Sequence, residues 1–295
     1  MAALWTRINT FLLILLVLMA GGTMAILATR AESGPLDPVG TPGPTLPQVE
    51  PRKPIPPVGW NGTFPVQITE PGSYFLTRNL VGVDGVDGIS ISSTDVVLDL
   101  NGFRLERSGP TPSEGIVVTA SATGGTVVIQ NGTLRSWSTG IDASAATGVR
   151  VSDIGISFSP QGILATAGGA TIEDCTVSNS GGIGITVTAG VVRRCTIFGN
   201  QQVGIRPQGN ATIEDNLVFD NGAGPHLTRS NIYVEGQYNL VRDNHIMTPE
   251  GGAPVLRITG TNNIIVRNFT RCIIVDGGGN FRPGALDYVD TNYCY

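Results

Sequence analysis

The sequence predicts an all-β protein that forms a right-handed parallel β-helix, a solenoid of about eight turns capped at both ends. One short pattern returns at intervals of 20 to 27 residues. Each return begins with an apolar pair, followed by a small-residue gap, a second apolar stretch, a bend and a third short strand. Ile, Val, Gly, Thr and Asn dominate these repeats, whereas a leucine-rich solenoid would show Leu. The eight starts are Gly88-Ile89, Gly115-Ile116, Gly140-Ile141, Gly162-Ile163, Gly184-Ile185, Gly204-Ile205, Asn231-Ile232 and Val255-Leu256.

The alternation of side chains within a repeat fits half-buried strands stacked on one another. Ile185 and Val187 share one face of their strand, and Thr186 and Thr188 share the other. Each buried Ile stabilises the fold by roughly 1.5–3 kcal/mol, so a stack can fold although a single turn cannot. A β-sandwich or propeller is the second fold to consider, and the lack of regularly spaced hairpin turns disfavours it. Stacking predicts one internal column made of Ile89, Ile116, Ile141, Ile163, Ile185, Ile205, Ile232 and Leu256.

Two segments precede the repeats. A lightly basic start and an apolar run over residues 11–20 predict that residues 1–31 are a signal peptide, or a membrane anchor if they are not cleaved. Residues 32–59 contain nine of the 19 prolines and are expected to form a Pro-rich linker. The β-helix domain is then expected over residues 60–295. Such a protein is secreted or associated with the cell envelope.

Both ends of the stack need a cap, because an open edge of a parallel sheet promotes aggregation. Strands near residues 64–68 and 73–76 are expected to cover the N-terminal end. The three glycines at 277–279 interrupt the repeat, and the tail to Tyr295 is expected to fold back as the C-terminal cap.

A family resemblance supports this fold. The segments PGSYFLTRNL at 71–80 and VLDLNGF at 97–103, followed by the Gly-Ile turns, resemble bacterial secreted right-handed β-helix repeat proteins of the pectate-lyase-like superfamily. The resemblance covers about residues 64–275. It does not imply one activity, because the superfamily includes lyases, hydrolases, epimerases and phage tailspikes.

The cysteines fall into two pairs. Cys175 and Cys195 occupy the same position of successive repeats, and Asn residues occupy that position in the later repeats. This column predicts an internal ladder at the bend, with a disulfide between the stacked turns as the alternative. Cys272 and Cys294 are expected to form a disulfide that holds the C-terminal cap. No metal is expected on these thiols, because the sequence has no CxxC pair.

Charged residues alternate beside this column. They predict a solvated ladder of ion pairs worth about 0.2–1 kcal/mol each, and a pair of glycosidase carboxylates is the alternative interpretation. The first position holds Glu173, Arg193, Glu214 and Arg242, and the next holds Asp153, Asp174, Arg194, Asp215, Asp243 and Arg267.

The catalytic motifs of known enzymes with this fold are missing. The sequence has no Asp-Asp pair and no Gly-His-Gly, and its one lysine is Lys53. Asp84 and Asp87 lie in a Gly-rich loop, which is expected to be a plain turn. A calcium ion bound there is the alternative, and no other cofactor is expected.

The outward positions of the first strand of each repeat hold the candidate site. Early repeats carry mostly small or aliphatic residues there, whereas the last repeats carry polar, aromatic and charged side chains, expected to lie about 5–10 Å from one another. Tyr could stack on a sugar ring while Arg pairs with a uronate carboxylate, and a solvated polar face is the alternative. The candidate substrate-binding residues are Arg206, Gln208, Tyr233, Arg257 and Arg229, and the last lies in the 220–230 connection with His226.

Three functions remain open. The first is an exported module that binds a polysaccharide, a cell-surface glycan or another surface partner. The second is a polysaccharide lyase, hydrolase or epimerase that acts on a uronate-containing glycan, with Glu235 or His226 as acid or base. The third is a structural envelope or adhesion protein. A net charge of −5 gives no sign of a nucleic-acid partner, and membrane contact is expected only through an uncleaved N-terminal segment.

Overall fold

The computed structural model describes residues 52–119, 122–224, 230–247 and 254–270, and the backbone of 274–276 and 293–294. All of them belong to one unit that spans residues 52–295. The expected signal or anchor at 1–31 and the linker up to residue 51 lie outside the described residues. In the part of the chain that is described, no helix is long and apolar enough to cross a membrane.

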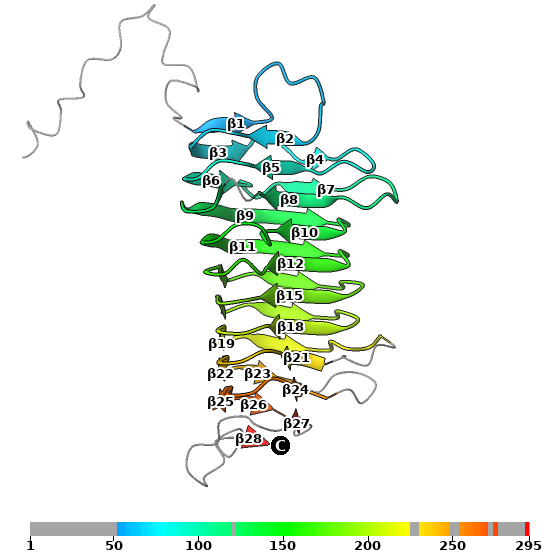
Figure 1. The fold of residues 1–295 in the computed structure, drawn as a ribbon. Helices are drawn as coiled ribbons and strands as arrows, with labels where there is room; N and C mark the ends of the chain where they lie inside the picture. Colours follow the sequence, from blue (N-terminus) through cyan, green and yellow to red (C-terminus); the bar gives the residue numbers. More distant parts are fainter. Residues whose placement is uncertain are drawn as a thin grey trace, which may run out of the picture. The chain divides into compact units, whose positions relative to one another are not determined.

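Parallel strands form two sheets along the coil (Figure 1). One sheet contains ten strands, each supplied by a different turn of the chain. In order, these strands are β2 (Val66–Ile68), β5 (Ile89–Ile91), β8 (Glu114–Val118), β10 (Thr139–Asp142), β12 (Gln161–Ala165), β15 (Ile183–Val187), β18 (Val203–Pro207), β21 (Ser230–Val234), β24 (Leu256–Ile258) and β27 (Ile274–Asp276).

The larger sheet contains 18 strands and receives two strands, or one long bent strand, from each turn except the outermost, which supply one short strand each. The early strands are β1 (Lys53–Ile55), β3 (Gly72–Leu76), β4 (Leu80–Val81), β6 (Val96–Asp99), β7 (Arg104–Glu106), β9 (Val127–Arg135) and β11 (Val149–Ser157). The middle strands are β13 (Thr171–Glu173), β14 (Thr176–Ser178), β16 (Val191–Arg193), β17 (Thr196–Phe198), β19 (Thr212–Glu214) and β20 (Leu217–Phe219). The last strands are β22 (Leu240–Arg242), β23 (His245–Ile246), β25 (Ile264–Val266), β26 (Phe269–Thr270) and β28 (Tyr293–Cys294).

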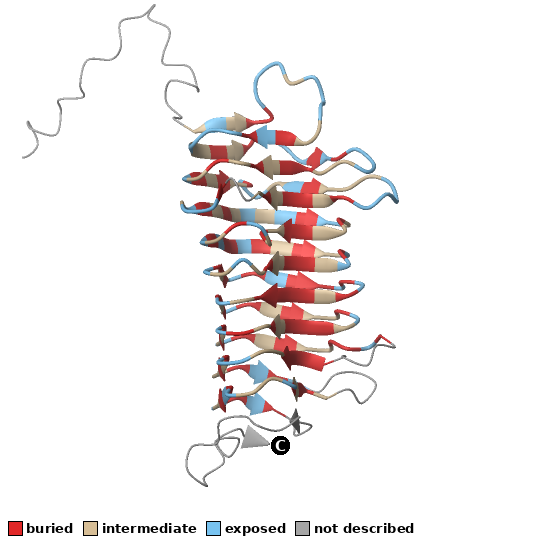
Figure 2. Ribbon diagram, in the orientation of Figure 1, coloured by how far each residue is buried: buried red, intermediate tan, exposed pale blue. Residues whose placement is uncertain are grey.

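The predicted internal column is confirmed. Ile89 pairs with Ile116, and the same register continues through every later turn to Ile232 and Leu256. All eight residues are buried in the core, and buried residues recur along the strands of the coil (Figure 2). Val66 precedes the column and Leu256 pairs with Ile274 beyond it, so the coil has about nine turns rather than eight.

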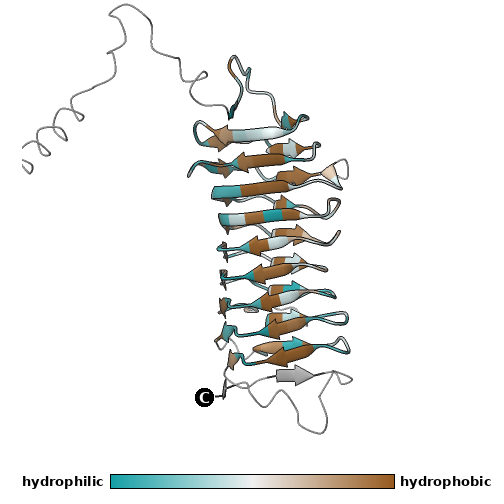
Figure 3. Cartoon of the chain, turned by 90° about the vertical axis from the view of Figure 1, so that its left-hand side faces the viewer, coloured by the Kyte–Doolittle hydropathy of each residue, from teal (hydrophilic) through white to brown (hydrophobic). Residues whose placement is uncertain are grey.

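The side-chain pattern explains why the strands close into a coil. Hydrophobic residues predominate in the strands, with hydrophilic residues interspersed, and hydrophilic residues are frequent at the connections (Figure 3). The core residue with the largest side chain is Trp137, which is fully buried and donates a hydrogen bond from Nε1 to the Leu105 carbonyl over 3.0 Å. Its ring takes the space left by glycines of neighbouring turns, among them Gly82 and Gly115. Glycine is thus needed at these positions for packing.

The N-terminal boundary differs from the prediction. β1 lies inside the expected linker of residues 32–59, and it pairs with β3 in register Lys53 to Tyr74 and Ile55 to Leu76. Ile55 is buried in the core. The proline-rich composition concealed this strand, but an outermost strand tolerates Pro54 because its outer edge makes no ladder hydrogen bonds. The fold therefore begins at about residue 52, and β1 adds to the expected N-terminal cap of β2 and β3.

The predicted ladder at the bend is also confirmed. Cys195 N–H donates to Asn216 Oδ1 over 2.9 Å, and the Asn216 and Asn244 side-chain amides donate to the next Oδ1, of Asn244 and Asn268, at the same distance. Cys175 and Cys195 stand in the first two positions as buried free thiols. The alternative of a disulfide between these stacked turns is therefore wrong.

Left-handed backbone residues make this bend. One residue per turn just before the ladder has a φ between 51° and 58°. Asp and Asn tolerate this region better than other side chains. Two arginines share the position, and each pairs with an aspartate one turn away: Arg194 with Asp174, and Arg267 with Asp243. The position is occupied by Asn131, Asp153, Asp174, Arg194, Asp215, Asp243 and Arg267.

The charge ladder forms, but one member is not solvated as predicted. The Glu173 side chain is only 2% exposed and contacts the guanidinium groups of Arg150, Arg193 and Arg194. Burial alone would raise the pKa of Glu173, but the hydrogen bonds from Arg193 and Arg194 and the charge of Arg150 outweigh it, so the pKa is lowered. Three long arginine side chains lie over this carboxylate and exclude water from it, which a residue pattern alone does not reveal.

Two more asparagine ladders were not predicted. Asn200 donates to Asn221, which donates to Asn231, where the chain enters the ten-stranded sheet: the first two lie in connections and Asn231 lies in β21. Asn239 donates to Asn263 at the connections that leave that sheet. These ladders were missed because the spacing varies: Asn221 and Asn231 are 10 residues apart, whereas Asn200 and Asn221 are 21 apart.

Candidate functional site

The predicted substrate-binding residues meet on the outward face of β18, β21 and β24. Tyr233 pairs with Arg257 in the parallel register, and Arg206 lies one turn earlier. The Cζ atoms of Arg206 and Arg257 lie 5.8 and 5.9 Å from the centre of the Tyr233 ring. The structure thus brings these three residues together as the sequence suggested.

Tyr233 cannot play the role that the sequence suggested. Its side chain was expected to stack on a sugar, but the residue is only 8% exposed because the two guanidinium groups flank its ring. Its hydroxyl accepts a hydrogen bond from Thr259 Oγ1 over 3.0 Å. Tyr233 therefore positions Arg206 and Arg257 through cation–π contacts. Thr259, which completes this arrangement, was not among the predicted site residues.

Glu235 is held by two side chains of the turn before it. Its Oε2 accepts hydrogen bonds from Arg206 Nε over 2.8 Å and from Gln208 Nε2 over 3.2 Å, and Arg206 Nη2 lies at 2.6 Å. The carboxylate therefore orients Arg206. We refer to Arg206, Gln208, Tyr233, Glu235, Arg257 and Thr259 as the arginine–tyrosine patch.

Two of the predicted site residues cannot be placed. His226 and Arg229 lie outside the described residues, in the connection before β21. The same holds for the side chains of Cys272 and Cys294, so their disulfide stays a prediction.

The Gly-rich loop of Asp84 and Asp87, which was expected to be a plain turn with bound calcium as the alternative, bonds to the next turn of the chain. Asp84 accepts hydrogen bonds from the Thr111 amide over 2.7 Å and from its hydroxyl over 3.0 Å. Asp87 accepts one from the Glu114 amide over 2.9 Å. Among the residues that the structure describes, no group of three or more His, Cys, Asp and Glu side chains is arranged to hold a metal ion.

An acidic group at the other end of the ten-stranded sheet was missed. Burial raises the pKa of Glu114, and a hydrogen bond with Asp87 and the charges of Asp87 and Asp142 add to the shift, so that the pKa reaches about 7. The sequence did contain a signal. Asp87 and Glu114 both precede the Gly-Ile pair of their repeats, so stacking places them next to each other.

Glu114 makes stability depend on pH in a testable way. The folded chain holds this proton more tightly than the unfolded chain, so raising the pH from about 4.5 to 7 costs the folded state stability. We expect Glu114→Gln to be more stable than the wild type at pH 8 and to lose this advantage near pH 4.5. Unfolding temperatures of both proteins across that range provide the measurement. An unchanged difference between them at all pH values would contradict the assignment.

The chain is similar to one solved structure and matches one family model. The A-module of the mannuronan C-5 epimerase AlgE4 of Azotobacter vinelandii matches with 13% identity over 68% of this chain and 68% of that chain, at a TM-score of 0.36. No curated protein matches the sequence significantly. A family model described as "right handed beta helix region" matches residues 87–238 and 140–283, well over half of the chain. The chain therefore belongs to the right-handed β-helix family, and its parallel coil is right-handed.

Proposed function

We propose that the chain is an exported β-helix module that binds an acidic carbohydrate through the arginine–tyrosine patch. The observation that carries this proposal is the pair of guanidinium groups held on either side of Tyr233. Two arginines and one glutamate give the patch a net charge of about +1, on a protein whose net charge is −5. Guanidinium groups fixed in this way suit the carboxylate of a uronate, which they can bind through paired hydrogen bonds.

The neighbouring groups favour a sugar over a simple anion. Gln208 and Glu235 lie beside Arg206 and offer amide and carboxylate atoms that can bond to hydroxyls. Successive turns are about 4.8 Å apart, so the patch can contact consecutive units of an extended polysaccharide.

Binding measurements on the full chain test this proposal. We expect Arg257→Gln to weaken binding of galacturonate oligosaccharides about tenfold, or about 1.4 kcal/mol, and added salt to weaken wild-type binding. The matched control is Arg242→Gln, which removes an arginine that pairs with Glu214 on the larger sheet. Equal affinity of Arg257→Gln and wild type in calorimetry would overturn the proposal.

The second candidate is an enzyme that acts on the same class of glycan. A lyase would release unsaturated uronides, a hydrolase new reducing ends, and an epimerase a changed uronate. Glu114 favours this alternative, since a carboxyl whose pKa is about 7 suits proton transfer near neutral pH. If the wild type turned over such a glycan and Glu114→Gln or Glu235→Gln did not, the function would be catalysis rather than binding alone.

A further inference from the structure

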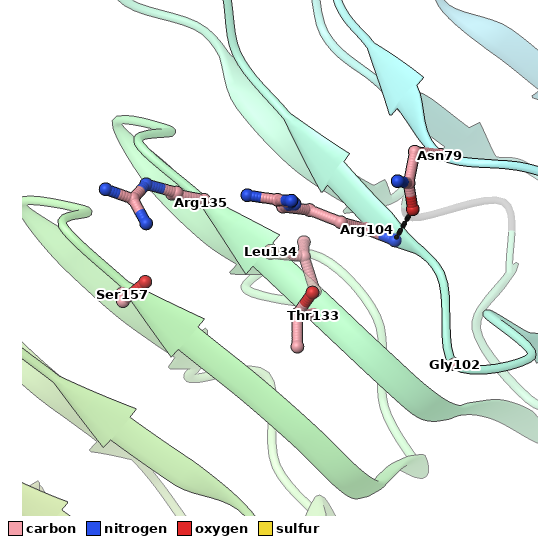
Figure 4. Close-up of a pocket in the computed structure, with 7 residues that line it drawn as sticks. All are labelled: Asn79, Gly102, Arg104, Thr133, Leu134, Arg135 and Ser157. Atoms are coloured by element: carbon pink, nitrogen blue, oxygen red, sulfur yellow. Dashed lines mark hydrogen bonds between the residues drawn. The ribbon is translucent and has the colours of Figure 1, made fainter.

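A groove crosses the outward face of the larger sheet, away from the ten-stranded sheet that carries the arginine–tyrosine patch. A cavity of about 440 Å³ lies over Asn79, Arg104, Arg135 and Ser157 (Figure 4). A second cavity of about 390 Å³ continues over Gly155, Asp153, Asp174 and Thr176. Both include Gly102 and Thr133, so they form one groove. It crosses five turns, which corresponds to a length of about 19 Å at the usual strand spacing.

One end of the groove is cationic. Arg104 and Arg135 come from the neighbouring strands β7 and β9, and their side chains point the same way across the groove (Figure 4). Their guanidinium nitrogens lie 3.5 and 3.6 Å from the carboxylate oxygens of Glu106. Two arginines around one glutamate leave a net charge of about +1 here. This end therefore favours an anionic group.

An unusual aromatic residue borders the same end. In each turn, the residue that follows the outward column Arg135, Ser157, Ser178, Phe198 and Phe219 has a φ between 50° and 66°. A bulky side chain in this region of backbone space is a genuine outlier. The five residues at this position are Ser136, Phe158, Asn179, Gly199 and Asp220.

Phe158 breaks the pattern without becoming buried. The other four residues at this position are glycine or small polar types, which tolerate a positive φ better than phenylalanine does. Phe158 nevertheless remains 50% exposed. Backbone outliers of this kind cluster at functional sites. The Phe158 ring lies under Arg135, whose Cζ is 4.6 Å from the ring centre. The pair joins an exposed apolar surface to an oriented cation.

The other end of the groove is suited to hydroxyl groups. Gly155 lies between Thr133 and Thr176 in the outward column, and Thr133 Cγ2 partly fills the space, 3.2 Å from the place that a Cβ would take. The threonine hydroxyls and the Asp153 carboxylate line this space, together with Asp174, which Arg194 neutralises through hydrogen bonds of 2.9 and 2.7 Å. Hydroxyls and carboxylates are partners for neutral parts of a sugar chain.

We propose that this groove is a second glycan-binding site, which takes an acidic oligosaccharide of about four units. The uronate carboxylate binds Arg104 and Arg135, and its sugar ring stacks on Phe158. The following units place hydroxyls along Thr133, Thr176 and Asp153. The site does not depend on the arginine–tyrosine patch, because it lies on another sheet and in earlier turns.

The decisive variant is Phe158→Asn, which inserts the residue type found one turn later at Asn179. A structural role for the ring predicts a lower unfolding temperature in this variant. A binding role predicts an unfolding temperature raised by about 2–4 °C, because the backbone strain is relieved. It also predicts that affinity for a tetrasaccharide of one terminal uronate and three neutral sugars falls at least about tenfold. Unchanged affinity, or a lower unfolding temperature with intact binding, would overturn the proposal.

A second pair of variants tests the groove without touching the ring. Gly155→Glu adds bulk and negative charge inside the groove, and Thr196→Glu adds the same charge two turns on in the same outward column, outside both cavities. We expect Gly155→Glu to abolish binding at this site and Thr196→Glu to retain it. Equal behaviour of the two variants would contradict a local site.

Stoichiometry separates this site from the patch. Calorimetry on the full wild-type chain is expected to show two bound tetrasaccharides, one weakened at least about tenfold in Phe158→Asn and the other about tenfold in Arg257→Gln. A single site that only Phe158→Asn weakens would support the groove and refute the patch. A single site that only Arg257→Gln weakens would do the reverse.

Discussion

Asn244→Leu is expected to lower the free energy of unfolding by about 3–6 kcal/mol, because it leaves several buried polar groups without partners at about 1–3 kcal/mol each. Asn244 is buried in the ladder at the bend. Its amide donates to the backbone carbonyls of Ile213 and Arg242 and to Asn268 Oδ1, each over 2.9 Å. Its Oδ1 accepts from the backbone and side chain of Asn216. Leucine has a similar volume and can replace none of these bonds.

Chemical denaturation followed by circular dichroism measures this effect. Asn244→Cys is the matched comparison, because Cys195 occupies the same column and a thiol can still make weak hydrogen bonds. We expect this variant to lose less stability than Asn244→Leu. If Asn244→Leu lowered the free energy of unfolding by less than about 1 kcal/mol, water or backbone movement would be supplying new hydrogen-bond partners to the groups that Asn244 left.

Trp137→Ala is expected to lower the free energy of unfolding by about 3–5 kcal/mol, the usual cost of emptying a buried tryptophan site. The cavity cannot close easily, since backbone hydrogen bonds to adjacent turns hold Gly82 and Gly88, and Gly115 lies within β8. The Leu105 carbonyl also loses the hydrogen bond from the indole.

Trp137→Phe separates packing from hydrogen bonding at this site. It keeps most of the buried ring and removes the Nε1 donor, so we expect a loss of only about 1–2 kcal/mol. Equilibrium unfolding of the two variants provides the comparison. Equal losses would show that the hydrogen bond to Leu105 matters more than the volume of the ring.

The core was predictable because the apolar residues that form it recur at the same position of each repeat. Ile163 and Ile185 are each preceded by Gly and each followed by a second apolar stretch, and period-two alternation directs both side chains inward. The ladder at Asn216 and Asn244 was predictable for the same reason, since both residues follow the same strand of their repeats. Repetition reveals which positions share a column without any knowledge of side-chain conformation.

The outward face was harder to predict because each long side chain there has several possible contact partners. Arg206 and Tyr233 were placed together correctly, but nothing in the sequence showed that arginines would cover the ring and remove it from solvent. Phe158 was missed because its importance depends on the φ of 57° that the coil imposes there. A positive φ at a bend can be predicted from Gly, Asn or Asp, but not from a phenylalanine, which rarely adopts it.

The register of the coil also determines how the two proposed glycan sites can change over time. The groove lies over the early turns and the patch over the late ones, and the turn that starts at Ile185 lies between them and pairs in the same register with the turns on either side. Duplication or loss of one such turn would move the sites apart or together by about 4.8 Å without altering a residue in either. The distance between the two proposed sites would then change in steps of one turn, and it could match the spacing of acidic units along a polymer.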